Sequence, residues 1–284
     1  MSSSLFTDAL CEDLIACGDP RENYGWVDRS FDYVARLNLN RSHVPALLAI
    51  ARQMVEPREW SDDEDDLSWT APIHAYRALA QLGAPEAVDA LLGMMDRLDE
   101  LDDGWYLEEF APALGLIGPP AFDATAAYLA DRGHRMYPVS AAAHAMEEIA
   151  NRHPEFRGRA VECIAGRLAD LEAVDTELNG FLVGFLLNLK AVEAAEVIER
   201  AYAADRVDDS IVGPWHKVRT ELGVEGLGLM SEAKARRGYE PAVGQHGGGG
   251  LIEPSDRLNR GFKSRDKQKR KAQKQAKRRG RRRR

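Results

Sequence analysis

Residues 74–88 read His-Ala-Tyr-Arg-Ala-Leu-Ala-Gln-Leu-Gly-Ala-Pro-Glu-Ala-Val. The first part of this stretch is rich in alanine, a strong helix former, and it stops at Leu82-Gly83. Pro85 and Glu86 follow at once, and both residue types suit the first turn of a helix. The stretch therefore predicts a helix, a tight turn and a second helix.

This pattern recurs along the chain. The apolar residues that align with Leu79 are Leu114, Ile149 and Leu186, at intervals of 35, 35 and 37 residues. We expect these four residues to be buried, whereas Arg167, on a second helix, is expected to be exposed. No sustained two-residue alternation indicates strands. Because each helix pair must bury its apolar stripe against its neighbours, the sequence predicts an all-α fold, an α-solenoid of stacked antiparallel helix pairs.

The regions on either side of the repeats are also expected to contain helices. Leu5 to Ile15 forms an apolar stretch, and Ser42 is suited to begin a helix that runs through Leu47. Residues 211–222 are expected to form half of a closing unit, with Trp215 packed against the last helix pair. The chain thus divides into four predicted regions: a helical N-terminal cap (1–60), the repeat solenoid (61–238), a Gly-rich flexible linker (239–262) and a basic disordered tail (263–284).

The charge is divided between two opposite parts of the chain. Residues 263–284 hold 14 basic residues and one acidic residue, whereas residues 1–262 hold 24 basic and 45 acidic residues. Mutual repulsion should keep the isolated tail disordered, and the phosphates of RNA would neutralise it. The predicted RNA- or ribosome-binding residues are Lys263, Arg265, Lys267, Lys269, Arg270, Lys271, Lys274, Lys277, Arg278, Arg279, Arg281, Arg282, Arg283 and Arg284.

Three other roles for the tail stay open at this point. It could clamp onto the acidic part of its own chain, contact an anionic membrane, or serve as a nuclear localisation signal. No aromatic residue follows Phe262, so stacking on bases is not expected, and any RNA binding should show little sequence preference.

The composition excludes several classes of protein. No apolar run approaches the ~20 residues of a membrane-spanning helix, and the first twenty residues lack the basic flank of a signal peptide. The three cysteines form no Cys-x-x-Cys pair, which argues against a disulfide framework and fits a reducing compartment. A cytoplasmic location is therefore expected.

The stretch from His74 to Val88 resembles the HEAT-like repeat of phycobilisome bilin lyases, in which an alanine-rich helix is followed by Leu-Gly, Pro-Glu-Ala and a second helix. The acidic segment before Trp69 and the following His-Ala are similar to uncharacterised bacterial HEAT-like proteins. Some of those proteins end in a cysteine-rich zinc motif, which a basic run replaces here. The resemblance covers about residues 60–205 and implies a HEAT-like fold without implying an activity.

A metal-dependent enzyme is the alternative. Deoxyhypusine hydroxylase is a HEAT-repeat protein that holds two irons with His-Glu pairs just before the Leu-Gly segment, and no such pair stands at the corresponding positions here. His74, Glu109 and His144 do occupy one equivalent position in three successive units, and imidazole and carboxylate groups suit a transition metal. A hydrogen-bonded polar ladder, or histidines that are each satisfied locally, would explain the same pattern.

Structural roles, without bound ligand or catalysis, are expected for two acidic runs and one cysteine. Asp62–Asp66 and Asp96–Gly104 are expected to be solvated loops between helices, and the first run could also dock a basic segment. The second run lacks the twelfth-position glutamate of an EF-hand, because Phe110 stands there, so calcium is not expected. Cys163 lies on the apolar stripe of a predicted helix and is expected to be a core thiol.

Together these features predict a non-enzymatic binding or scaffold protein without a cofactor. Its acidic repeat surface would bind a protein partner, and its basic tail would contact RNA or the ribosome.

Overall fold

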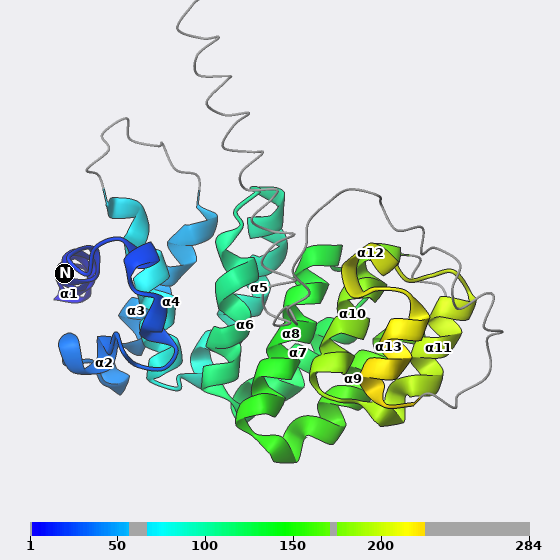
Figure 1. The fold of residues 1–284 in the computed structure, drawn as a ribbon. Helices are drawn as coiled ribbons and strands as arrows, with labels where there is room; N and C mark the ends of the chain where they lie inside the picture. Colours follow the sequence, from blue (N-terminus) through cyan, green and yellow to red (C-terminus); the bar gives the residue numbers. More distant parts are fainter. Residues whose placement is uncertain (1, 57–66, 171–174, 225–284) are drawn as a thin grey trace, which may run out of the picture. The chain divides into compact units, whose positions relative to one another are not determined.

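The structure is a computed structural model that describes residues 2–56, 67–170 and 175–224, and every regular element in these ranges is helical (Figure 1). This confirms the predicted all-α class. The described residues fall into two compact units, which divide between Ala173 and Val174. None of the described helices has the length and apolar character needed to cross a membrane.

The first unit contains nine α-helices among its described residues. They are α1 (Ser2–Ile15), α2 (Tyr33–Arg36), α3 (Val44–Ala51), α4 (Ala71–Gln81), α5 (Val88–Glu100), α6 (Trp105–Ile117), α7 (Pro119–Ala130), α8 (Met136–Arg152) and α9 (Arg157–Leu168). Short 3-10 turns at Pro85–Ala87 and Pro154–Phe156 lead into α5 and α9. The predicted pairs α4/α5, α6/α7 and α8/α9 are all present.

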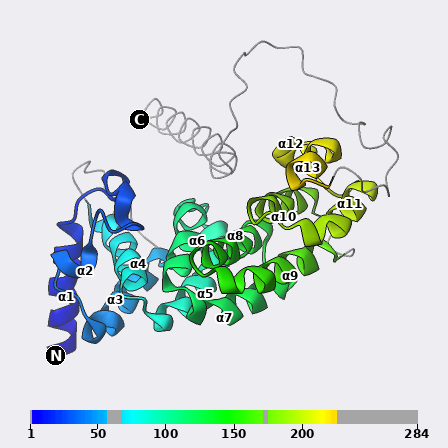
Figure 2. The ribbon, with the colours of Figure 1, turned by 60° about the horizontal axis from the view of Figure 1, so that its bottom comes forward.

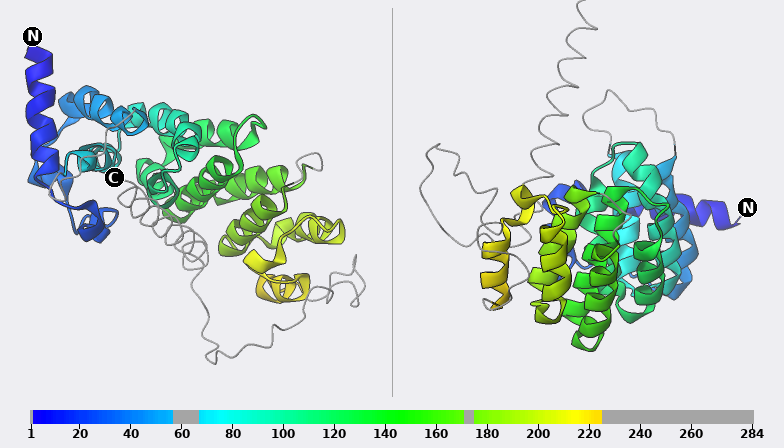
Figure 3. Two further views of the ribbon diagram at one scale, coloured as in Figure 1. Left: turned by 90° about the horizontal axis from the view of Figure 1, so that it is seen from above. Right: turned by 90° about the vertical axis from the view of Figure 1, so that its right-hand side faces the viewer.

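These pairs form two layers within the first unit. Helices α4, α6 and α8 contact one another in that order, and α5, α7 and α9 do the same. Figure 2 shows α6 and α8 in one row and α5 and α7 in the other. In Figure 3, α1 appears in dark blue at the edge of the unit, where it contacts α3 and α4.

The core lies where the repeat spacing predicts it. Leu79, Leu114 and Ile149 are at most 1% exposed in the first unit, as is Leu186 in the second. The stripe along α5 is buried in the same way, from Val88 to Met95. Burial of each large apolar side chain contributes about 1.5–3 kcal/mol, so these equivalent positions are a main source of stability.

The four turns between paired helices share a second feature. The aligned residue that ends each first helix has a positive φ in three of the four cases: 57° at Gly83, 78° at Gly118 and 50° at Lys190. His153 occupies the same position in the third pair with φ −130°. A left-handed residue is a common way to end a helix sharply, which explains why glycine recurs there.

The second unit contains α10 (Thr176–Asn188), α11 (Ala195–Ala203), α12 (Asp209–Val212) and α13 (Trp215–Leu222) among its described residues. Asp175 caps α10, because its side chain accepts a hydrogen bond from the Leu178 N–H. Trp215 is 1% exposed, and its ring centre lies 5.7 Å from that of Tyr202 on α11. The predicted packing of Trp215 on the last helix pair is therefore confirmed.

Four local expectations need correction. Ser42 does not cap α3; Asn40 caps the 3-10 turn Arg41–His43 that leads into α3, because its carboxamide oxygen accepts the Ser42 N–H. The Arg167 side chain is only 8% exposed and lies 3.9 Å from Asp170. Cys163 is half-buried instead of fully buried. Asp96–Gly104 is not one loop, since α5 continues to Glu100.

Several predicted features lie outside the described residues. They are the acidic run Asp62–Asp66, the last part of the predicted solenoid region after residue 224, the Gly-rich linker and the whole basic tail.

Candidate functional site

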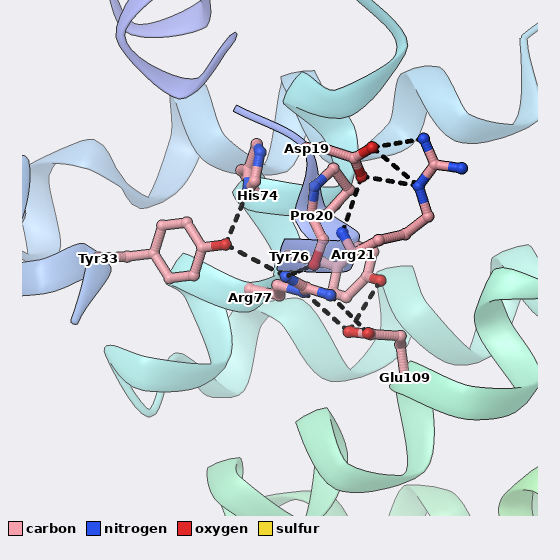
Figure 4. Close-up of polar contacts among 8 residues, drawn as sticks. All are labelled: Asp19, Pro20, Arg21, Tyr33, His74, Tyr76, Arg77 and Glu109. Atoms are coloured by element: carbon pink, nitrogen blue, oxygen red, sulfur yellow. Dashed lines mark hydrogen bonds and ion pairs between the residues drawn. The ribbon is translucent and has the colours of Figure 1, made fainter. Parts of the chain in front are cut away.

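Three polar side chains form a buried stripe along α4. His74, Arg77 and Gln81 are spaced by three and four residues, which places them on one face of the helix. Their exposed fractions are 0%, 1% and 3%. Because a buried polar group is costly unless it is hydrogen-bonded, each of them needs partners. The N-terminal segment from Cys17 to Tyr33 supplies most of these partners (Figure 4).

His74 bridges two parts of this N-terminal segment. Its Nε2 lies 2.9 Å from the Gly18 carbonyl oxygen, and its Nδ1 lies 2.6 Å from the Tyr33 hydroxyl. A carbonyl can only accept, so Nε2 carries the proton, and the Tyr33 hydroxyl donates to Nδ1. Burial lowers the pKa of His74 to about 4. The imidazole is therefore neutral near pH 7.

Arg77 lies at the centre of the network and binds Glu109 of α6 at two points. Its Nε donates to Glu109 Oε2 at 2.9 Å, and its Nη2 donates to Oε1 at 2.6 Å. Its Nη1 donates to the Pro20 carbonyl oxygen at 3.1 Å, and its guanidinium lies 5.3 Å from the centre of the Trp26 ring. Burial alone would lower the pKa of Arg77, but the hydrogen-bonded carboxylate outweighs that effect and raises it.

Gln81 binds the C-terminal half of the N-terminal segment from Cys17 to Tyr33. Its Nε2 donates to the carbonyl oxygens of Trp26 at 2.6 Å and Phe31 at 2.9 Å. Its Oε1 accepts the Tyr33 N–H at 2.8 Å. The stripe on α4 thus satisfies main-chain groups between Gly18 and Tyr33, and it fixes the path of the chain that leads into α2.

The three residues of the alternative metal site have separate partners. His74 binds Gly18 and Tyr33, and Glu109 binds Arg77. The Nε2 of His144, on α8, lies 3.8 Å from a carboxylate oxygen of Glu148, and burial lowers the pKa of His144. Among the residues that the structure describes, no three His, Cys, Asp or Glu side chains are placed to hold a metal ion.

Arg77 and Gln81 were not singled out from the sequence. The signal that would have indicated them is their spacing from His74 on a helix whose other residues are mostly small or apolar. Every residue of α4 is buried, so polar residues at this spacing must meet other parts of the chain.

A second cluster surrounds two carboxylates on α5. Asp96 Oδ2 accepts the Tyr128 hydroxyl at 2.8 Å and lies 2.6 Å from His134 Nδ1. The Tyr128 and His134 rings stack with their centres 3.6 Å apart. Asp99 accepts the Tyr106 hydroxyl at 2.9 Å. These contacts join α5 to α6, to α7 and to the segment between α7 and α8.

The electrostatics of this cluster follow from its hydrogen bonds. Burial alone would raise the pKa of Asp96, but the bonds from the Arg135 N–H, Tyr128 and His134 outweigh it and lower the pKa. Arg135 also pairs with Asp99 through its side chain. The carboxylate oxygens of Asp96 and Asp99 thus accept hydrogen bonds from donors of the chain itself.

Comparison with other proteins adds no further assignment. No protein-family model matches the chain, and neither the curated proteins nor the solved structures give a significant match. The basic residues of the tail lie outside the described residues, so the nucleic-acid interface stays a prediction from the sequence.

Proposed function

We propose that this protein is a non-enzymatic binding or scaffold protein of the HEAT-like, α-solenoid type. Its acidic helical surface binds a protein partner, and its polybasic tail contacts RNA or the ribosome in the cytoplasm. The observation that carries the proposal is the concentration of 14 basic residues in the last 22, next to a chain with an excess of acidic residues.

The layered helix pairs support the solenoid. In the first unit, equivalent helices contact one another in sequence order, and the aligned residues Leu79, Leu114 and Ile149 are all buried. Each pair therefore covers the apolar stripe of the next, which is the physical basis of a repeat protein. Stacked helix pairs form an extended surface that is not built around one catalytic centre, and such a surface suits protein binding.

The tail supports binding to a polyanion. A dense run of lysine and arginine releases the counterions of a nucleic acid when it binds, and this contribution does not depend on base sequence. Lysine, arginine, glutamine and alanine are also good helix formers once phosphates neutralise the charge.

The alternative of a metal-dependent enzyme has less support. His74 and Glu109 are directed at hydrogen-bonding partners of their own, and Glu109 neutralises a buried guanidinium. Moving either side chain to a metal would leave a buried polar group without its partner, which is unfavourable. We therefore assign these residues a structural role and propose no cofactor.

The test is RNA binding as a function of salt. If six to ten tail cations contact phosphates, the logarithm of affinity for single-stranded RNA should fall with the logarithm of salt concentration with a slope of roughly −4 to −7. Oligonucleotides of different sequence should bind alike. A chain truncated after Leu258 should lose RNA binding and keep its helical melting curve, because it retains all described helices.

Two results would count against the proposal. If the truncated chain bound RNA with the same slope, the tail would not be the nucleic-acid element. If affinity purification of the full and truncated chains recovered neither RNA nor a common protein partner, the scaffold role would fail.

A further inference from the structure

His134, in the segment between α7 and α8, has a fixed orientation. Its Nδ1 lies 2.6 Å from Asp96 Oδ2, and its ring stacks on that of Tyr128 with an angle of 9° between the two planes. Burial alone would raise the pKa of Asp96, but the hydrogen bonds that Asp96 accepts lower it. Asp96 is therefore ionised near pH 7 and can only accept a hydrogen bond, so Nδ1 of His134 carries a proton.

The other ring nitrogen of His134 lies near a second carboxylate. Nε2 is 3.6 Å from Asp131 Oδ2, which is longer than a hydrogen bond. The other oxygen of Asp131, Oδ1, accepts the Gly133 N–H at 2.8 Å, and this bond orients the carboxylate. The side chains of His134 and Asp131 are 25% and 61% exposed, so solvent reaches both. In the neutral imidazole with a proton on Nδ1, two atoms with lone pairs thus lie 3.6 Å apart.

This separation suits two ligands of one transition-metal ion. Zinc forms bonds of about 2.0–2.2 Å to nitrogen and oxygen, and in a tetrahedral site two such ligand atoms are about 3.4 Å apart. A histidine that binds a metal commonly donates its other ring N–H to a carboxylate, and Asp96 occupies that place here. Imidazole suits zinc and related metals, whereas magnesium and calcium prefer oxygen ligands alone.

The neighbouring arginines pair with other carboxylates. Arg132 Nε lies 2.7 Å from Asp170 Oδ2, and the side chain of Arg135 pairs with Asp99. A cation bound between His134 Nε2 and Asp131 Oδ2 would therefore displace neither of these two ion pairs.

We propose that His134 Nε2 and Asp131 Oδ2 bind one divalent transition-metal ion of the zinc type, with Asp96 as the positioning residue behind the imidazole. Water completes the coordination, because no group of three His, Cys, Asp or Glu side chains in the described part of the chain could do so. The ion joins the two ends of the turn that follows α7. This inference does not depend on the proposed function, so either can fail without the other.

The experiment is a titration of the full chain, without an affinity tag, with zinc chloride at pH 7. Proton–nitrogen NMR spectra of the histidine rings follow the site, and His134→Gln identifies the His134 signals. Zinc should shift the Nε2 signal of His134 while Nδ1 keeps its proton. Magnesium chloride at the same concentration should shift neither signal, because magnesium binds imidazole poorly.

Calorimetry of three variants tests the role of each side chain. His134→Gln should abolish this zinc binding. Asp131→Asn keeps an acceptor for the Gly133 N–H but loses the charged ligand, and it should weaken zinc binding at least tenfold. Asp96→Asn keeps both ligands, yet it should weaken zinc binding about 10- to 100-fold. In the zinc-free NMR spectrum of Asp96→Asn, the proton should no longer be confined to Nδ1, a change that a merely structural role would not produce.

His153 provides the matched control. Its Nδ1 lies 3.9 Å from Glu155 Oε1, a similar distance between an imidazole and a carboxylate. His153→Gln should leave the zinc affinity unchanged. A thermal melt of each variant shows whether it is folded, and Asp131→Asn, at an exposed position, provides the test if Asp96→Asn is not folded.

Two results would overturn the inference. If zinc leaves the ring signals of His134 unchanged, its contact with Asp131 is an ordinary ion pair and the metal site is wrong. If His134→Gln retains the zinc affinity of the original chain, zinc binds elsewhere, such as at a cysteine, and the assignment to His134 and Asp131 is equally wrong.

Discussion

Arg77 of α4 and Glu109 of α6 form an ion pair with two hydrogen bonds, of 2.9 and 2.6 Å, in the interior of the first unit. The Arg77 side chain is 1% exposed and that of Glu109 is 12% exposed. The pair ties one helix pair to the next, and it also orients the guanidinium toward the N-terminal segment. Folding buries both charges, so each charge is stabilised by the other instead of by water.

Loss of one partner should be costly. Arg77→Met leaves the Glu109 carboxylate without its buried counter-charge and should lower the free energy of unfolding by about 3–5 kcal/mol. Arg41→Met removes an exposed ion pair with Glu86 and should lower it by at most ~1 kcal/mol. Urea unfolding of the two variants measures the difference. A double variant, Arg77→Met with Glu109→Leu, should recover much of the loss.

Acid should destabilise the fold through His74. The pKa is about 4 in the folded protein and near 6.5 when unfolded, so the unfolded chain binds more protons between these values. The contribution of His74 to the free energy of unfolding is therefore complete above pH 6.5. This contribution is lost as the pH falls to 4, by roughly 3 kcal/mol in total. Unfolding free energies at pH 7 and pH 4.5 give the change.

The control for this pH effect is His74→Gln. A glutamine carboxamide can still accept from Tyr33 but does not titrate, so the variant should lose less stability between pH 7 and pH 4.5 than the original chain. Equal losses in the two proteins would assign the acid effect to other groups.

A charge at an aligned core position should disrupt the repeat packing. Ile149 is fully buried on α8, so Ile149→Asp places an unpaired carboxylate in the core and should cost at least ~4 kcal/mol. Glu162→Gln, at an exposed position of the neighbouring α9, should change stability by less than about 0.5 kcal/mol. Thermal melts compare them, and similar small effects would contradict the alignment.

The turn glycines should differ in their tolerance of a side chain. Gly118 has φ 78° and ψ −141°, a region that only glycine adopts readily, and an added Cβ would lie 2.6 Å from His153 Nε2. Gly83 has φ 57°, and an added Cβ meets no atom within 4 Å. We expect Gly118→Ala to cost about 2–3 kcal/mol and Gly83→Ala about 1 kcal/mol in chemical denaturation. The reverse order would be inconsistent with these turn geometries.

The helix pairs could be predicted from the sequence because their signals are local. The apolar spacing around Leu79, and the glycine and proline that follow it, act within one or two turns. The interactions of His74 and Arg77 could not be predicted in this way. Their partners Gly18, Pro20 and Tyr33 are 41–57 positions away along the chain.

The acidic run after Asp96 shows a second limit. Clustered acids are typical of loops, yet Asp96 and Asp99 belong to α5, where donors from α6, α7 and the following segment bind them. A charge run in the sequence does not indicate whether its members face solvent or a neighbouring helix. That distinction depends on Tyr106 of α6 and Tyr128 of α7, which lie on other helices than the acids that they bind.

The polar stripe on α4 binds its N-terminal partner mainly through main-chain atoms: the carbonyls of Gly18, Pro20, Trp26 and Phe31 and the N–H of Tyr33. Main-chain groups are the same for nearly every amino acid. Substitutions along much of this segment should therefore be tolerated as long as its path is kept, whereas the histidine, arginine and glutamine of the helix should tolerate few.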